Sequence, residues 1–229
     1  MSGFDGLPPE LFTFFERLRQ DNSREFWDAN KSTWVTMVHD PFEALLAELA
    51  GEFPPMRMFR PHRDVRFSKD KSPYKLWVGA TSESRAIGGT GYYLRVDESG
   101  LATGYGSMVL ARDQLRRFRA AIDDDHSGRQ FEELTTQLAT ASLPVTFGAE
   151  PPLKTSPPGY PKTHPRIEHL RWKGAAMVKE YDRADWMYTR QALDTIRGIW
   201  RAAEPLKQWM DTHVGASVQP VAGPNRSRK

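Results

Sequence analysis

The hydrophobic positions of the first fifty residues recur every three or four residues, which is the period of an amphipathic α-helix. Pro9 can begin the first helix, because its fixed φ and missing N–H suit a first turn. Ser23 can cap a second helix, and Asp40 followed by Pro41 is predicted to begin a third, which ends at Gly51. The stripes are Leu11, Phe14, Phe15 and Leu18; Phe26, Trp34 and Val38; and Phe42, Leu45, Leu46 and Leu49. These residues predict a helical layer.

The period changes to two after Pro54 and Pro55. Val65 and Phe67 alternate with Asp64 and Arg66, which predicts a strand over residues 62–68. Three further β-like runs cover residues 76–81, 91–96 and 101–109. Because the links between them are short and contain no helix, we expect the strands to be antiparallel.

Helical spacing returns after residue 110, with two helices marked by Leu115, Phe118 and Ile122 and by Phe131, Leu134 and Leu138. Residues 143–165 hold seven of the 17 prolines and no periodic pattern. Loops in compact domains rarely exceed ~12–15 residues, so this stretch is expected to be functional or a linker. A final helix is predicted around Trp186, Leu193, Ile196 and Trp200, with Pro205 restarting it.

These elements predict an α+β fold. We expect a single domain over residues 1–213, with an antiparallel sheet of about four to five strands packed by N-terminal and C-terminal helices. Residues 214–229 are rich in Gly, Pro and Ser and carry Arg226, Arg228 and Lys229, which predicts a disordered basic tail.

Composition removes several classes of protein. The chain has no cysteine, which excludes disulfides, thiolate metal sites and cysteine nucleophiles. Its longest apolar runs are too short to cross a bilayer, and its N-terminus lacks the basic and apolar regions of a signal peptide. We therefore expect a cytoplasmic protein with no membrane partner.

Positive charge is concentrated in one stretch. Residues 57–75 contain seven Lys or Arg and two Asp, a balance of +5, whereas the whole chain is only +3 and the remainder is slightly acidic. Charge that is focused in this way favours a binding site over a broad coat of nucleic-acid contacts.

In the predicted strand the charged side chains share one face, because alternation places Arg60, His62, Asp64 and Arg66 on the same side. Two carboxylates cannot neutralise seven cations, so the face repels itself unless an anion or distant acids balance it. A phosphate or carboxylate suits guanidinium donors. The alternative is structural, with Arg63 or Arg66 paired to Asp64 or Asp70.

The proline-rich stretch supplies the other concentration of polar chemistry, which could close over the basic stretch as a lid. The predicted anion-binding residues are Arg63, Asp64, Arg66, Lys69, Asp70, Lys71, Tyr74, Lys75, Lys154, Tyr160 and His164. No catalytic residue is assigned.

Three other motifs in the chain are better explained without a catalytic, metal-binding or nucleotide-binding role. Residues 68–71 and 72–75 fit the S-x-x-K pattern, but Pro73 predicts a turn where that chemistry needs a helix. The six histidines lack the spacings of a zinc site. The glycines at 88, 89 and 91 precede a strand, whereas a nucleotide phosphate loop precedes a helix. We predict neither a metal nor a cofactor.

Several blocks resemble an uncharacterised family called domain of unknown function 2461. The most specific is Arg63 to Lys75, which reads R-D-x-R-F-S-x-D-K-x-P-Y-K. Residues 22–31 resemble the family's N-x-x-x-W-F-x-x-N-K region with the aromatic pair swapped, and residues 91–94 resemble its G-F-Y-L strand. Residues 153–173 resemble a later block through Leu153-Lys154, Pro157, Gly159-Tyr160, His164-Pro165 and Lys173. The resemblance covers nearly the whole chain and implies no particular activity.

Three functions remain open. The first is a site for a phosphorylated or otherwise anionic small molecule or nucleotide, on which the protein could also act as a catalyst. The second is a nucleic-acid-binding module, which the acidic remainder of the chain disfavours. The third is a structural or partner-binding protein whose charges pair internally. The oligomeric state is not predicted.

Overall fold

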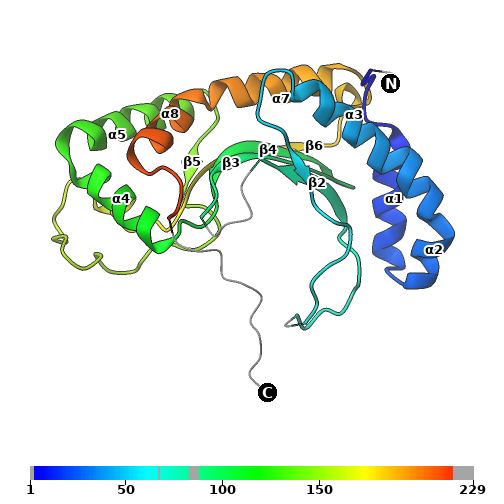
Figure 1. Ribbon diagram of the computed structural model, residues 1–229, viewed down its shortest axis with the longest axis horizontal. Coiled ribbons are helices and arrows are strands. Elements are labelled where there is room, and N and C mark those ends of the chain that lie inside the picture. The colour runs from blue at the N-terminus through cyan, green and yellow to red at the C-terminus, as the bar shows by residue number, and fades with distance from the viewer. Residues whose placement is uncertain (1–2, 67, 83–87, 219–229) are drawn as a thin grey trace. The chain divides into compact units, whose positions relative to one another are not determined.

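The computed structural model describes residues 3–66, 68–82 and 88–218 and has an α+β fold (Figure 1). The first two predicted helices are confirmed as α1 (Pro9–Gln20) and α2 (Arg24–Thr33). The Ser23 hydroxyl accepts a hydrogen bond from the Phe26 N–H at 3.1 Å, so it caps α2 as expected.

The predicted start of the third helix at Asp40 is confirmed, but Asp40 does not cap it. A π-helix, η1 (Trp34–His39), joins α2 to α3 (Asp40–Leu49) without a break. The Asp40 N–H donates to the carbonyl of Val35, five residues earlier, and His39 keeps helical backbone angles. Asp40 therefore has no free N-cap position to fill.

The three predicted β-like runs form a sheet, whose order is β1-β2-β3-β4-β6-β5 over the described residues. The strands are β1 (Arg57–Met58), β2 (Trp77–Thr81), β3 (Gly91–Asp97), β4 (Gly100–Ser107), β5 (Val145–Thr146) and β6 (Ala175–Asp182). β2 pairs with β1 and β3, and β5 pairs with β6, each in antiparallel register. Six strands slightly exceed the predicted four to five. β6 was missed because its short apolar run, residues 175–178, has no clear period.

The remaining elements are α4 (Arg112–Asp123), α5 (Asp125–Thr140), α6 (Ile167–Leu170), the 3-10 helix η2 (Asp185–Tyr188), α7 (Gln191–Ala202) and α8 (Glu204–His213). Trp186 was expected on the final helix but lies in η2, and α7 begins after it. The predicted restart at Pro205 is confirmed, because α8 carries this proline in its first turn.

Residue contacts divide the chain into two compact units. Unit 1 comprises Met1–Ser82, Tyr93–Thr103 and Glu180–Ile199, and unit 2 comprises Glu83–Tyr92, Gly104–Lys179 and Trp200–Lys229. Strands β3, β4 and β6 each contribute residues to both units. The single domain expected from the sequence stays a prediction.

In unit 1 the helical layer is built on aromatic side chains. α1 packs against α2 and η1, and η1 against α3 (Figure 1). The Phe12 ring meets the Tyr188 ring edge-on at 5.7 Å, and the Arg183 guanidinium lies over the Phe12 face at 4.6 Å. The fully buried members include Phe12, Phe15, Leu18, Phe42 and Leu45.

In unit 2, α4, α5 and α8 pack against one another (Figure 1), and their aromatic side chains form a second core. Phe118, Phe131 and Trp209 contact one another with ring centroids 4.6–5.9 Å apart. The buried indole N–H of Trp209 donates to the Ser127 carbonyl at 3.0 Å, which satisfies its donor.

Residues Val214–Val218, expected to begin a disordered tail, are bound to α4. The buried Asp113 carboxylate accepts from the Ser217 hydroxyl at 2.8 Å and the Val218 N–H at 2.9 Å. Gln114 donates to the Gly215 carbonyl at 2.7 Å, and Arg117 donates to the Ala216 carbonyl at 2.7 Å. These residues therefore belong to the folded part of unit 2, and the rest of the predicted tail lies outside the described residues.

Across the described residues, none of the helices has both the length and the apolar character needed to span a bilayer.

We expect Phe118→Ala to lower the free energy of unfolding by about 3–5 kcal/mol, because it leaves a cavity among packed rings. Urea denaturation followed by tryptophan fluorescence measures this change. Phe147→Ala is the matched control, since Phe147 is 37% exposed, and it should cost less than about 1 kcal/mol. Equal losses in the two variants would contradict the burial assigned to Phe118.

Candidate functional site

The basic stretch joins β1 to β2, and we call residues 59–76 the basic loop. The strand predicted over residues 62–68 is wrong: the loop's described part contains one isolated bridge, between His62 and Tyr74. The Arg63 N–H donates to the Pro73 carbonyl, and the Lys75 N–H donates to the Pro61 carbonyl, each at 2.8 Å. Because both prolines lack an N–H, these pairs cannot be completed as a normal strand ladder.

The alternation predicted for this stretch survives without the strand. His62, Asp64 and Arg66 are exposed, whereas Arg63 and Val65 are half-buried. Phe67, expected on the same side as Val65, lies outside the described residues.

Each aspartate of the basic loop engages one arginine. Asp64 accepts from the Arg66 Nε at 2.9 Å and the Nη2 at 2.6 Å, a bidentate pair. Asp70 accepts from the Arg63 Nη1, and its other oxygen accepts from the Ser72 hydroxyl at 2.6 Å. The bonds from Arg66 lower the pKa of Asp64 to about 2, and those from Ser72 and then Arg63 hold the pKa of Asp70 well below its usual range.

Two of the three lysines in the basic loop, Lys71 and Lys75, are bound differently, because their partners are main-chain carbonyls. The Lys75 Nζ donates to the carbonyls of Arg60 and His62, the second at 2.9 Å, and it lies 5.5 Å from the Trp77 ring centre. The Lys71 Nζ donates to the Val65 carbonyl at 3.0 Å. Among the described residues no carboxylate forms an ion pair with either ammonium group. Burial, and then the charge of Arg60, lower the pKa of Lys75.

A pocket of about 430 Å³ opens on this loop and the start of β2. Its lining residues are Arg63, Asp64, Asp70, Tyr74, Lys75, Leu76 and Trp77. Five of these belong to the predicted set, whereas Arg66, Lys69 and Lys71 of that set do not line it. Leu76 and Trp77 were missed, although their position directly after Lys75 at the start of a strand could have indicated them.

The other predicted residues lie in unit 2. His164 is held at both ring nitrogens: its Nε2 lies 3.1 Å from Asp123 Oδ1, and its Nδ1 accepts from the Arg166 N–H at 3.0 Å. Tyr160 packs edge-on to this ring at 6.4 Å, and burial raises the pKa of its hydroxyl. Lys154 is exposed.

Arg166, which the sequence did not indicate, anchors the proline-rich stretch to α4. The side chain is buried, and it donates to the Ile122 carbonyl at 2.6 Å and the Asp123 carbonyl at 2.9 Å. It therefore satisfies carbonyls at the C-terminal end of α4. The joining of His164 and its neighbours with the basic loop into one site stays a prediction.

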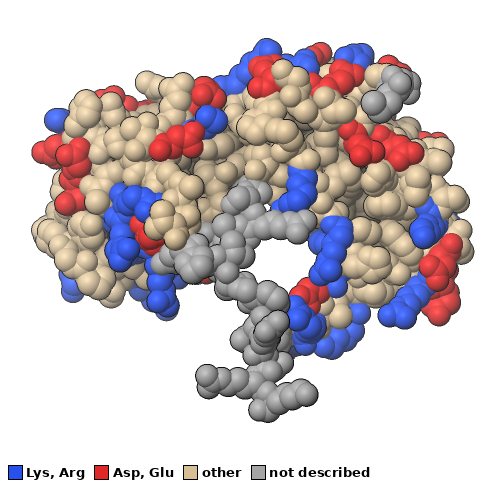
Figure 2. Space-filling view, in the orientation of Figure 1, with Lys and Arg blue, Asp and Glu red and all other residues tan. Residues whose placement is uncertain are grey.

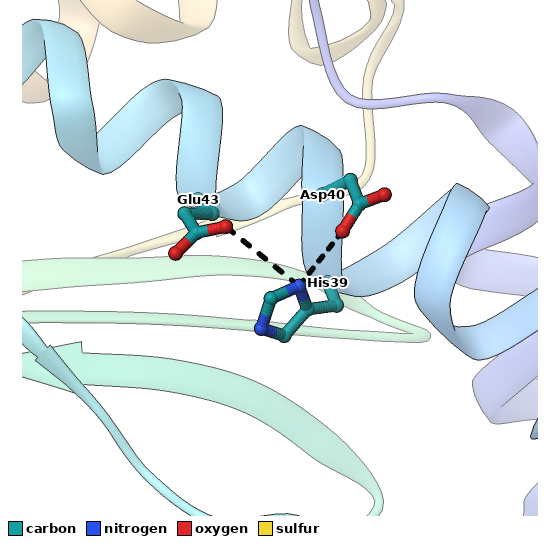
Figure 3. A group of neighbouring side chains, drawn as sticks. All are labelled: His39, Asp40 and Glu43. Atoms are coloured by element: carbon teal, nitrogen blue, oxygen red, sulfur yellow. Dashed lines mark hydrogen bonds and ion pairs between the residues drawn. The ribbon is translucent and has the colours of Figure 1, made fainter.

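Within the described chain, one group has ligand atoms close enough to share a metal ion: His39, Asp40 and Glu43 (Figure 3). The His39 Nδ1 lies 2.9 Å from Asp40 Oδ1 and 3.9 Å from Glu43 Oε2. Both carboxylates are exposed, and a hydrogen bond between His39 and Asp40, with Glu43 one helical turn along, accounts for the arrangement. Its spacing, i, i+1 and i+4, is not one that a search for paired histidines finds.

The Asp64 carboxyl is expected to titrate near pH 2, since Arg66 stabilises its charged form. An unfolded aspartate titrates near ~3.9, so this pair favours the folded loop above that pH and loses its contribution as the pH falls toward 2. Carbon-detected NMR titration measures the value. Arg66→Ala should return it toward ~3.9, whereas Lys69→Ala, which leaves the bidentate donors in place, should change it little. An unchanged pKa in Arg66→Ala would refute the pair.

Comparison with known proteins supports the resemblance seen in the sequence. No curated protein and no solved structure matches the chain. The family described as "Conserved hypothetical protein (DUF2461)" matches residues 10–209, which include the basic loop, the proline-rich stretch and all the strands. The chain belongs to this family.

Proposed function

We propose that the pocket of the basic loop binds the phosphate or carboxylate group of a small molecule or nucleotide. The observation that carries this proposal is Lys75, which lines the pocket and whose ammonium group has no carboxylate partner among the described residues. Residues 57–75 hold five more positive than negative charges, and an anion would relieve their mutual repulsion.

The pocket retains donors for such a group. A guanidinium has five N–H donors, and Asp70 engages one nitrogen of Arg63, which lines the same pocket as Lys75. An ammonium has three donors, and two carbonyls account for two of those on Lys75. Arg63 and Lys75 together can therefore donate to two oxygens of one anion.

A purely structural role for the arginines is the first alternative. It requires Arg63 and Arg66 to be buried as well as paired. The Arg66 side chain is 77% exposed and the Arg63 side chain 29% exposed. Exposed ion pairs stabilise a fold only slightly, because water screens them. The pairs orient the arginines more than they hold the unit together.

Nucleic-acid binding is the second alternative. It needs a broad positive surface that tracks successive phosphates. On the face drawn in Figure 2, Lys and Arg are interspersed with Asp and Glu. Apart from the basic stretch the chain carries a net negative charge. Both observations favour a local anion site.

We expect the protein to bind sulfate and inorganic phosphate, measured by isothermal titration calorimetry at low ionic strength. Lys75→Met keeps the apolar stem and removes the charge, so it should weaken binding at least tenfold. Arg63→Ala should have a similar effect. Arg129→Ala is the control, because it removes one exposed positive charge from α5 in unit 2, and it should leave the affinity unchanged.

Equal weakening in all three variants would show that net charge and not the pocket attracts the anion, which would sink the proposal. Tighter binding of single-stranded DNA than of phosphate, with a steep dependence on salt, would favour the nucleic-acid alternative.

A further inference from the structure

Asn22, in the turn between α1 and α2, makes an unusual pair of contacts with the basic loop. Its Nδ2 donates to the Tyr74 carbonyl, and its Oδ1 accepts from the Tyr74 N–H, each at 3.1 Å. The carboxamide thus satisfies both main-chain groups of one residue 52 positions later in the chain. A neighbouring strand would normally supply this pattern.

The Tyr74 side chain is also held by the helical layer. Its ring stacks on the Trp27 indole of α2, with centroids 4.2 Å apart and planes 8° from parallel. Both rings are buried, and the His62 ring contacts Tyr74 at 5.0 Å. The helical layer therefore holds Tyr74 by its backbone and by its ring.

Tyr74 lies between the groups that shape the pocket. Lys75 follows it directly, and Pro73 before it accepts the Arg63 N–H at 2.8 Å. The backbone on either side of Tyr74 thus carries one pocket cation and anchors the other. A shift of Tyr74 would move Lys75 and Arg63 relative to each other, and two-point recognition of an anion depends on that separation.

We infer that Asn22 is a positioning residue for the anion pocket, acting through the main chain of Tyr74. This inference rests on the proposed function. The role needs a planar group with one donor and one acceptor, which a carboxamide provides. An aspartate offers no donor to the Tyr74 carbonyl, and a leucine offers neither bond, so the structure gives Asn22 a task that neither residue can perform.

The test uses the full chain with Asn22→Leu and Asn22→Asp. Asn30→Leu is the control, because within the described part of the chain the Asn30 side chain bonds only locally, to the Phe26 carbonyl at 2.8 Å within α2. Hydrogen exchange without any anion should show at least tenfold faster exchange at Tyr74, Lys75 and Arg63 in Asn22→Leu, and a smaller increase in Asn22→Asp, whose carboxylate still accepts from the Tyr74 N–H. Amides of α5 in unit 2 should be unchanged, which shows that the variants are folded. Unchanged exchange at the three amides would overturn the inference.

Sulfate affinity then shows whether Asn22 positions the anion-binding groups or only stabilises the loop. Asn22→Leu should weaken sulfate binding at least tenfold, and combining it with Lys75→Met should cost little beyond Lys75→Met alone, because both act on the same ammonium group. Additive losses, or faster exchange with unchanged affinity, would refute the positioning role while leaving the pocket intact. Absence of sulfate binding in the natural sequence would instead overturn the proposed function.

Discussion

Mutual repulsion among the cations of residues 57–75 is the constraint on which the basic loop depends. Two aspartates each engage an arginine, and two lysines donate to main-chain carbonyls of the same loop. Carbonyls satisfy the hydrogen-bonding capacity of an ammonium group but do not cancel its charge. The loop can therefore be well ordered and still attract an anion, which is the basis of the proposed function.

The helical layer of unit 1 supplies hydrogen-bond partners to the main chain of this loop. A loop that leaves the sheet between two prolines loses the ladder partners that a strand would have. Asn22 forms hydrogen bonds with both main-chain groups of Tyr74 in this loop, and Trp27 stacks on the Tyr74 ring. The turn after α1 thus has a second task besides reversing the chain, and the positioning role proposed for Asn22 follows from it.

In unit 2, side chains likewise form hydrogen bonds with main-chain groups near the two ends of α4. Arg166 satisfies carbonyls at its C-terminal end, while Asp113 and Arg117 near its start bind residues 214–218. His164 is engaged at both ring nitrogens in this arrangement. Its participation in anion binding would require breaking one of these contacts, so the lysine and arginine of the basic loop are the stronger candidates.

The sequence by itself determined the helices with strong 3.6-residue periods, the three central strands, the family and the place where charge is concentrated, because each is a local property. It could not determine that residues 62–66 leave the sheet, that η1 continues α2 into α3, or that β6 lies between β4 and β5. Those outcomes depend on partners distant in the chain. Asn22 is the clearest case: its role exists only because folding brings Tyr74 to it.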